Sequence, residues 1–394
     1  MTLSWRHTLR LVVLALACAG FSLASPAADP ARSPDATLCL AADLHFHCAN
    51  ERIPANLWMV NALNRTAMLA WPAEIGDKPS GLAFAGAPVT SPAGVVLLGD
   101  LTDNGKKAEL DGYPWLYGFR HFYEADPKRK DCLSLPAWIG LGNHDFGNGQ
   151  GQGDGKLMRG YVAQRHAGPK APVPVDEFDA ATGCYAFAWG GALVIQLHRF
   201  AADTAGGTRP SAIPWLKKTL ESRAGDGRPV LICQHYGFDA FSLEERWWTE
   251  KDRREFLDTL RGFNVVGIFH GHSHAAAHYQ IEGIDVYRVN NVAPEIGIGN
   301  NDGPGSFTLI RLDGKTLTVL PCQVTDDKGT VRFAKDGFHH KNVSKGKMIG
   351  TQDTGSRTQD KFQSPEPLAK PRGFAGSQKT EARSSSQKPE ASSQ

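Results

Sequence analysis

Four histidines fall within ten residues of this 394-residue chain, in the stretch FHGHSHAAAH at 269–278. They are His270, His272, His274 and His278, out of 14 histidines in all. Neutral imidazole is a common ligand of divalent transition metals. The stretch is therefore a metal site, a histidine-rich low-complexity tract, or a strand that carries imidazoles incidentally. Composition does not separate these three, so the rest of the chain must decide.

Four other short motifs also place metal-capable side chains directly after apolar runs. With the histidine stretch they form an ordered series of five: DLH (Asp43, His45), GD (Asp100), GNHD (Asn143, His144, Asp145), QH (Gln234, His235) and GHSH (His272, His274). Open α/β sheets assemble their sites at the carboxyl ends of strands. Each motif alone occurs by chance in many proteins. Five of them, each at a predicted strand end, indicate one composite site.

The donor types of this series indicate which ions it would bind. Carboxylate and imidazole suit borderline divalent cations such as Zn, Mn and Fe, and the lack of thiolates argues against a closed structural zinc site. In an extended segment, residues two apart point the same way and lie roughly 6.7 Å apart along the strand. His272 and His274 are thus expected to flank a pair of ions, with Gly271 keeping the backbone slim beside them.

The series resembles the pattern of the calcineurin-like metallophosphoesterase family, DxH, GD, GNH(D/E), H and GHxH, over residues 37–292. The resemblance implies a four-layer α/β/β/α sandwich with mixed sheets and a site for two divalent ions, Mn, Fe or Zn. One ion would be held by Asp43, His45, Asp100 and His274, and the other by Asp100, Asn143, His235 and His272. Asp100 would bridge ions about 3.5–4 Å apart, and neutral Asn143 would limit the negative charge of the set.

The resemblance also implies catalytic roles. A water or hydroxide between the ions would attack phosphorus in line, and His144 would donate a proton or hydrogen bond to the leaving oxygen. Asp103, three residues after the bridging Asp100, stands where the protein phosphatase branch has an Asp that orients this histidine. Asn104 stands where that branch has a phosphate-gripping arginine, so GDLTDNG is closer to the branch with bacterial phosphodiesterases. Purple acid phosphatases carry a tyrosine ligand at the position of Asp103, so no iron–tyrosinate is expected.

Short apolar runs alternating with amphipathic stretches predict the α/β elements that position these residues. Strands are expected at 37–43, 94–100, 136–143, 184–189, 192–198, 229–235 and 264–271. Helices are expected at 55–70, 106–124, 156–166, 213–222 and 249–261. After residue 275 closely spaced strands with EG and DG turns predict antiparallel hairpins.

The ends of the chain differ from its middle. Residues 1–24, with Arg6 and Arg10 before a short apolar run, have the pattern of a signal peptide, and LALAC gives a less favoured alternative in which Cys18 is lipidated. We expect the metallophosphoesterase domain at 37–325 and a disordered low-complexity tail at 350–394, rich in Ser, Gln, Lys and Pro. No apolar run is long enough to span a membrane.

Charge and cysteine content add two expectations. A net charge of +2 without a basic run does not favour nucleic acid as a partner. In an oxidising compartment the cysteines could form disulfides, with Cys39–Cys48 the favoured pair and Cys233 a buried free thiol.

Several residues near the motifs have open roles. His47, His270 and His278 are expected to be structural or peripheral, while His198 either approaches the substrate or caps a strand. The aromatic residues after His235 either line a pocket for an apolar or aromatic leaving group or pack a loop onto the core: Tyr236, Phe238, Phe241, Trp247 and Trp248. The glycine-rich run 147–155 is either a substrate lip or a connector.

Together these features predict an exported, secreted or periplasmic, dinuclear phosphoesterase that hydrolyses a phosphodiester or phosphomonoester. The substrate would be a phosphate-ester small molecule or a lipid headgroup. The alternative is a non-catalytic envelope protein that captures metal or phosphate, although capture would not require His144 and Asp103. The ester type, native metals and oligomeric state stay open at this stage.

Overall fold

The structure is a computed structural model of the chain. It describes residues 35–46, 53–113, 116–126, 128–147, 155–203, 210–243, 247–292 and 305–343. The predicted signal peptide, Cys18, His47, Cys48, the core of the glycine-rich run and the predicted tail at 350–394 lie outside these residues. In the described part, no helix is both long and apolar enough to cross a membrane.

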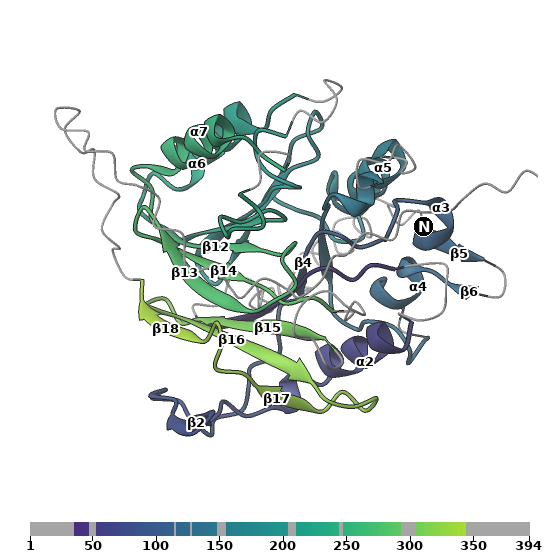
Figure 1. The fold of residues 1–394 in the computed structure, drawn as a ribbon, viewed down its shortest axis with the longest axis vertical. Helices are drawn as coiled ribbons and strands as arrows, with labels where there is room; N and C mark the ends of the chain where they lie inside the picture. Colours follow the sequence, from purple (N-terminus) through teal and green to yellow (C-terminus); the bar gives the residue numbers. More distant parts are fainter. Residues whose placement is uncertain are drawn as a thin grey trace, which may run out of the picture.

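Two seven-stranded sheets face each other (Figure 1). The first has the order β17-β16-β15-β1-β4-β7, with β18 also paired to β16. Its strands are β1 (Ala36–Ala41), β4 (Val95–Leu98), β7 (Ala137–Gly140), β15 (Ser306–Leu312), β16 (Thr316–Val324), β17 (Val331–Phe333) and β18 (His339–Asn342). Within it β1, β4 and β7 run parallel, whereas β1, β15 and β16 pair antiparallel.

The second sheet has the order β13-β14-β12-β11-β10-β9-β8. Its strands are β8 (Glu177–Phe178), β9 (Tyr185–Trp189), β10 (Ala192–Gln196), β11 (Val230–Gln234), β12 (Val265–His270), β13 (Ala277–Ile281) and β14 (Ile284–Arg288). Here β10, β11, β12 and β14 are parallel, and β9 and β13 pair antiparallel at the two sides. Both sheets are therefore mixed.

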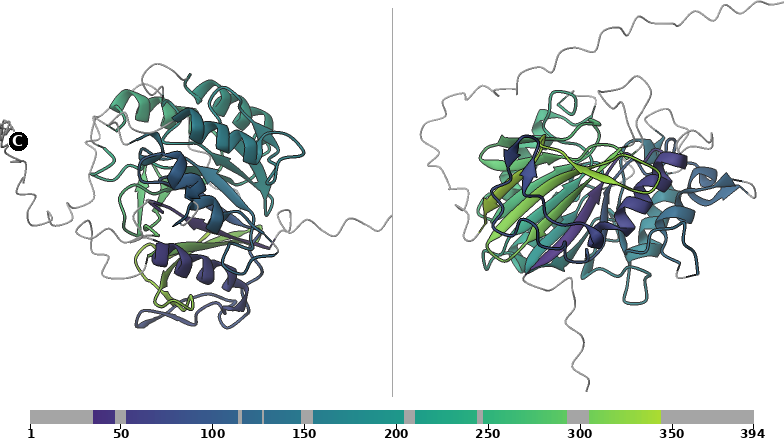
Figure 2. Two further views of the ribbon diagram at one scale, coloured as in Figure 1. Left: turned by 90° about the vertical axis from the view of Figure 1, so that its right-hand side faces the viewer. Right: turned by 90° about the horizontal axis from the view of Figure 1, so that it is seen from below.

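Helices cover the outer faces of the two sheets (Figure 2). On the second sheet lie α6 (Ile213–Arg223) and α7 (Glu250–Leu260), whose apolar side chains share a core cluster with β10, β11 and β12. On the first sheet lies α2 (Ile53–Asn64), followed by the short η3 (Thr66–Met68). The order of layers is α/β/β/α, which confirms the predicted sandwich.

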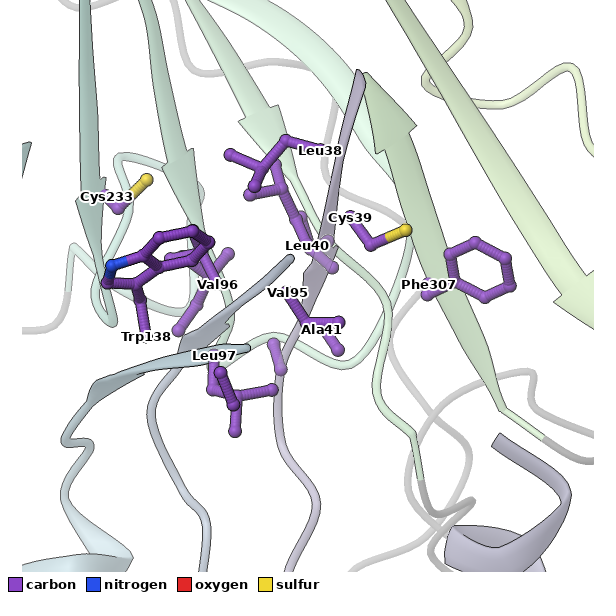
Figure 3. Packing of buried hydrophobic residues seen from close by; sticks show 14 of the residues in the cluster. Leu38, Cys39, Leu40, Ala41, Val95, Val96, Leu97, Trp138, Cys233 and Phe307 are labelled. Carbon is purple, nitrogen blue, oxygen red and sulfur yellow. The ribbon is translucent and has the colours of Figure 1, made fainter. Parts of the chain in front are cut away.

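The space between the sheets is filled by large side chains (Figure 3). The indole of Trp138 on β7 stacks on the ring of Phe187 on β9, with centroids 4.4 Å apart, and the indole N–H of Trp189 donates to Thr37 O at 3.3 Å. Along β1, Leu38 and Cys39 point to opposite faces of the sheet, as the pleat requires. Because both faces are covered, every residue of β1 is buried, which explains why it is apolar except for Thr37, whose hydroxyl donates to Thr90 O at 2.6 Å.

The seven strands predicted before residue 275 all form, and the helices predicted at 156–166, 213–222 and 249–261 form with bounds within one residue of those expected. The helix predicted at 55–70 is shorter than expected, because α2 ends at Asn64 and the separate η3 follows it. The fifth predicted helix, at 106–124, is wrong as a single helix. It is two short helices, α3 (Lys107–Asp111) and α4 (Phe119–Tyr123), on either side of a hairpin of β5 (Gly112–Tyr113) and β6 (Leu116–Tyr117). Gly112 has φ 84°, outside the helical region, and breaks the helix there.

The region after residue 275 forms antiparallel hairpins as predicted. In the first, Glu282 and Gly283 both have positive φ, 48° and 80°, between paired Ile281 and Ile284, as in a two-residue primed turn. The fold also continues beyond the expected limit at residue 325, because β17 and β18 both pair with β16. A further small hairpin joins β2 (Glu74–Ile75) to β3 (Lys78–Pro79).

Cys39, one member of the favoured disulfide pair, forms no disulfide with any residue that the structure describes. Cys39 is a free thiol, fully buried on β1, with its sulfur 3.9 Å from the hydroxyl of Thr66. A central position in the first sheet holds this sulfur in the core under η3, and Cys48 lies outside the described residues. Cys233 is a buried free thiol, as predicted. Burial raises the pKa of Cys39 to about 12, so this thiol is unreactive.

Candidate metal centre

The five motifs meet at one edge of the sandwich. Asp43, Asp100 and Asn143 follow the parallel strands β1, β4 and β7 of the first sheet, while His235 and His272 follow β11 and β12 of the second. Parallel neighbours end at the same edge of a sheet, and the two sheets place these edges side by side. The predicted site thus lies between the sheets, at their carboxyl ends.

The structure divides the predicted ligands into two compact groups. Asp43, His45 and His274 form the first, and Asp100, His235 and His272 form the second; within each group the donor atoms lie within 4.8 Å of one another. All six side chains are buried. The division is the one that the resemblance implied.

The first group is held together tightly. Nε2 of His45 lies 3.1 Å from Nε2 of His274, and Oδ1 of Asp43 lies 3.4 Å from Nε2 of His274. The Asp43 carboxylate also accepts the backbone N–H of His272, at 3.1 Å to Oδ1 and 3.0 Å to Oδ2. This bond ties the DLH segment of the first sheet to the GHSH segment of the second.

Asp100 lies between the groups, as the predicted bridge requires. Its Oδ2 is 3.1 Å from Nε2 of His235 in the second group and 3.9 Å from Nε2 of His45 in the first. Its Oδ1 accepts the backbone N–H of His144 at 2.8 Å, which fixes the carboxylate. Asn143 completes the second group, with Oδ1 3.0 Å from Nε2 of His235.

The backbone of the ligand segments is strained. Six described non-glycine residues have a positive φ, and five of them are predicted ligands. These five are Asp43 (54°), His45 (46°), Asp100 (51°), His272 (69°) and His274 (49°). Such conformations each cost roughly 1–3 kcal/mol and concentrate at functional sites. The extended geometry predicted for His272 and His274 is therefore wrong, because β12 ends at His270 and the left-handed turns send the two imidazoles to different groups.

Glycines allow the segments to approach so closely. A Cβ on Gly142 would lie 2.1 Å from Oδ1 of Asp100, and a Cβ on Gly271 would lie 2.5 Å from Oδ2 of Asp43. The first distance leaves no room for a side chain at position 142, the glycine of the GNHD motif. The second confirms that Gly271 keeps the backbone slim beside the histidines.

Outer contacts orient two of the imidazoles. Nδ1 of His235 donates to Leu98 O at 3.0 Å, which turns its Nε2 toward Asp100. Nδ1 of His45 faces Oδ1 of Asp103 at 3.5 Å, which turns its Nε2 toward the first group. A ligand histidine is commonly held in this way, with a carbonyl or carboxylate on its outer nitrogen.

His144 is more exposed than the candidate ligands, at 22% against 0–9% for the side chains of His45, His235 and His274. Its Nδ1 lies 2.8 Å from the backbone oxygen of Asp103 and 3.6 Å from that residue's Oδ1. The carbonyl only accepts, so Nδ1 carries the proton and Nε2 is turned away from Asp103. The backbone of Asp103 thus orients His144 more closely than the side chain does, which revises the predicted orientation through the carboxylate. That carboxylate lies between His45 and His144.

Asp145 supports the site, although no role was predicted for it. Its carboxylate accepts the backbone N–H groups of Leu101, Thr102 and Gly142 at 2.9–3.2 Å, and the hydroxyl of Thr102 at 2.9 Å. It therefore joins the turn after β4 to the turn after β7. Burial and the negative charge of Asp100 raise its pKa to about 7. The signal in the sequence for this role was the aspartate at the fourth position of the GNHD motif.

Burial and mutual charge set the protonation of the site. Burial opposes the charge on Asp100, yet His235 and the other nearby imidazoles hold the pKa of this carboxyl well below its usual range. Burial lowers the pKa of His45, and burial with the charge of His235 lowers the pKa of His272 further. Burial also opposes a proton on His235, but the Asp100 carboxylate raises its pKa to about 9. Metals bind ionised carboxylates and neutral imidazoles, so Asp100, His45 and His272 are already in the binding form, whereas a cation bound at His235 would displace its proton.

The donor set fits two divalent cations. Within the described residues, only imidazoles lie within ion-pair distance of the buried carboxylates of Asp43 and Asp100, and Nε2 of His272 is buried without a hydrogen-bond partner. Buried carboxylates and an unpartnered buried imidazole nitrogen are unfavourable unless a cation binds them. Asp43, His45 and His274 would hold one cation and Asn143, His235 and His272 the other, with Asp100 shared.

The other histidines of the motif region lie outside both groups. The ring of His270 contacts Gly271 O at 2.8 Å and the Tyr279 hydroxyl at 2.9 Å, a structural role as expected. The ring of His198 is buried and faces Gly183.

His278 lies in a separate cluster with Asp285 and His339 that joins the second sheet to β18. Lys341 is ion-paired to Asp285 in this cluster and competes with any cation for its carboxylate. The pairing leaves this cluster less suited to a metal than the group of Asp43 and the group of Asp100.

The aromatic segment after His235 divides between the two predicted roles. Tyr236, Phe238 and Trp248 are buried and pack into the core under α6 and α7. Phe241 and Trp247 instead lie against the imidazole of His272, with ring centroids 4.8 and 4.7 Å away. Packing onto the core therefore explains three of the five residues.

Comparisons with known proteins agree with this geometry. The family model for calcineurin-like phosphoesterases matches residues 37–276, and no curated protein matches the sequence. The chain belongs to the calcineurin-like phosphoesterase family, whose members are hydrolases that act on phosphate esters and bind two metal ions.

Three solved structures are similar in fold. The GAP50 anchor in the inner membrane complex of Plasmodium is 13% identical, with a TM-score of 0.50 over 80% of this chain and 90% of that one. A dimetal phosphatase from Danio rerio is 12% identical (TM-score 0.49, 78% and 99%). The purple acid phosphatase PPD1 from yellow lupin (Lupinus luteus) seeds is 13% identical (TM-score 0.45, 77% and 54%). At these identities the likeness concerns the fold alone.

Proposed function

We propose that the chain is an exported phosphoesterase that uses two divalent cations, Mn, Fe or Zn, to hydrolyse a phosphodiester or phosphomonoester. The observation that carries the proposal is the position of Asp100 between two buried groups of ligands, with the partly exposed His144 beside it. When bound, the two cations supply a water of lowered pKa and neutralise charge on the phosphoryl oxygens.

The residues of the chain carry out the remaining steps. Burial opposes a charge on His144, but the Asp100 carboxylate raises its pKa and favours the imidazolium, with a proton on each nitrogen. The carbonyl of Asp103 holds Nδ1–H, and Nε2–H is presented to the ester and passes to the leaving oxygen, which leaves a neutral imidazole. Neutral Asn143 keeps the second group less negative, which favours an anionic phosphate. Asn104 takes no part in gripping phosphate, because its side chain and backbone N–H both bind Glu109, at 3.0 and 2.8 Å. The lack of an arginine there supports a substrate unlike that of protein phosphatases.

A non-catalytic protein that captures metal or phosphate is the second candidate. The fold alone does not separate the two, since a protein described as an anchor shares it. The placement of His144 favours catalysis, because capture needs no proton donor oriented by a carbonyl.

The decisive experiment is a turnover assay on the purified full chain. Mono-aryl and bis-aryl phosphates would be offered after reconstitution with Mn, Zn or Fe. Hydrolysis of either ester that a chelator abolishes supports the phosphoesterase, and the ratio of the two rates gives the ester type. Metal binding with no hydrolysis of either ester under any reconstitution would support capture instead.

Export is proposed from the N-terminal sequence, whose basic residues, short apolar run and small residues match a signal peptide. Fractionation of cells expressing the full chain, with the N-terminus of the mature protein sequenced, tests this. Cleavage near residue 24 and recovery outside the cytoplasm are expected. A full-length chain in the cytoplasm would contradict export, and a lipid on Cys18 would indicate a lipoprotein.

A further inference from the structure

Three aromatic rings surround the imidazole of His272. The ring centroid of Tyr236 lies 4.6 Å from that of His272, Trp247 lies 4.7 Å away in an edge-on contact, and Phe241 lies 4.8 Å away. His272 belongs to the same ligand group as Asp100 and His235. The aromatic rings therefore adjoin the place where the phosphate would bind.

Phe241 is exposed to solvent, whereas Tyr236 is buried and Trp247 is half-buried. The exposed fraction of Phe241 is 43%, against 1% for Tyr236. The other large apolar side chains exposed in the described chain, Met68, Tyr113 and Tyr117, are in η3 and the β5–β6 hairpin, away from the metal-capable groups. Ligand sites commonly combine aromatic side chains with a few polar groups, as Phe241 and the metal-capable residues do here.

The backbone at Phe241 is held in place by the side chain of Asp239. Oδ1 of Asp239 accepts the backbone N–H groups of Phe241 and Ser242, both at 3.0 Å. Oδ2 of the same carboxylate accepts the hydroxyl of Ser273 at 2.6 Å, and Ser273 lies between His272 and His274. Asp239 thus fastens the loop of Phe241 to the loop that carries two candidate ligands.

Trp247 extends the surface. Its ring centroid lies 6.0 Å from that of Phe241, at an interplanar angle of 50°. The carboxylate of Asp239 is turned inward to Ser273 and the backbone, so it adds no charge to the face of these rings. Phe241 and Trp247 together present an aromatic surface beside His272.

We propose that Phe241 and Trp247 determine specificity by stacking on a planar aromatic group of the phosphoester, such as an aryl ring or a nucleobase. The inference rests on the proposed function, because the phosphate must sit at the metal centre for the group to reach the rings. Stacking is tolerant of ring type, since every planar aromatic group offers a π-face. The preference is therefore for aromatic over alkyl esters, not for one particular ring.

The test uses the full chain loaded with Mn and two ligands that are not hydrolysed, phenylphosphonate and methylphosphonate. Calorimetry gives both dissociation constants for the wild type and for Phe241→Ala, Phe241→Leu and Trp247→Leu. Phe241→Ala is expected to weaken phenylphosphonate about tenfold and methylphosphonate less than about twofold. Phe241→Leu keeps an apolar side chain without a flat face and should fall between the wild type and Phe241→Ala. Met68→Ala, a matched exposed apolar residue on η3, should change neither constant.

The ratio of the two constants distinguishes recognition from packing. If Phe241 only packs the loop, both ligands weaken together or neither does, and the inference is overturned. A wild type that binds the two phosphonates equally well also overturns it. Neither outcome affects the proposed function, which depends on chelator-sensitive turnover. If the chain binds phenylphosphonate through Phe241 yet hydrolyses no ester, the stacking inference is supported and the proposed phosphoesterase activity is contradicted.

A second pair of ligands separates the two sources of an aromatic group. A nucleoside 5′-phosphonate and phenylphosphonate should both lose affinity in Phe241→Ala, and the one that loses more identifies the better occupant. If neither ligand loses more affinity than methylphosphonate does in Phe241→Ala, stacking is contradicted.

Discussion

Nε2 of His235 lies 3.1 Å from Oδ2 of Asp100, and the same oxygen lies 3.9 Å from Nε2 of His45 in the other ligand group. His235 follows a strand of the second sheet and Asp100 a strand of the first. The contact therefore joins the two halves of the sandwich at the centre of the proposed metal site. Its position explains why one carboxylate can serve two cations.

Asp100→Asn should remove most of the activity. An amide lacks the charge needed to hold two cations against their repulsion, so at least one ion per chain is expected to be lost. Metal content by mass spectrometry and turnover of an aryl phosphate measure both effects. A variant that keeps two ions and near-normal turnover would show that Asp100 is not the bridge.

His144→Ala should separate catalysis from metal binding. Removing a general acid typically costs 10²- to 10⁴-fold in rate, and we expect a loss in about that range with metal content close to that of the wild type. Loss of metal in this variant would instead make His144 a ligand.

Asp103→Asn should be milder than His144→Ala. The backbone carbonyl that holds Nδ1 of His144 is unchanged by the substitution, whereas the carboxylate near His45 and His144 is neutralised. A rate loss of about tenfold or less is expected, smaller than that of His144→Ala. Equal losses in the two variants would show that the carboxylate, not the carbonyl, orients the catalytic histidine.

Gly142→Ala should disrupt the metal centre. The new Cβ would lie 2.1 Å from Oδ1 of Asp100 and 2.7 Å from Cε1 of His235, so the bridge must shift. We expect a loss of roughly 1–3 kcal/mol in the free energy of unfolding, together with weaker metal binding. Gly160→Ala is the matched control, because Gly160 lies within α5 (Gly155–His166) and nothing lies within 4 Å of its Cβ position. This control should be neutral or stabilise the fold by up to about 1 kcal/mol.

His166 should make the fold sensitive to acid. This fully buried imidazole accepts the backbone N–H of Ile139 at 3.1 Å through Nε2 and donates to Val173 O at 2.8 Å through Nδ1. Burial lowers its pKa from the ordinary 6.5 to about 4. Between these values the unfolded chain binds more protons than the folded one, so the free energy of unfolding falls as the pH is lowered from 6.5 toward 4.

Denaturant titrations at pH 7 and pH 5 measure this effect. His166→Asn has no titrating group, so its loss of stability between the two pH values should be smaller than that of the wild type by roughly 2 kcal/mol. Identical losses in the two proteins would mean that His166 does not contribute to the acid sensitivity.

Much of the site could be predicted because its residues are close to strand ends. Asp43, Asp100 and His235 each follow an apolar run, so a strand pattern and the order of motifs suffice to bring them to one edge. The division of ligands into two groups came from the family pattern. The structure places the predicted ligands together in that division.

The remaining features depend on backbone conformation and long-range contacts that no local pattern carries. The left-handed turns at His272 and His274 override the extended geometry expected from sequence spacing. The sequence pattern predicts one helix over 106–124, but Gly112 ends the first helix at Asp111. The link from Asp239 to Ser273 spans 34 residues and joins two loops, so only the folded chain reveals it.

The most direct test of the account is anomalous diffraction from crystals of the Mn-loaded chain. We predict two peaks about 3.5–4 Å apart, one beside Asp43, His45 and His274 and the other beside Asn143, His235 and His272, with Asp100 between them. A single peak, or peaks only at the cluster of His278, Asp285 and His339, would contradict the dinuclear centre.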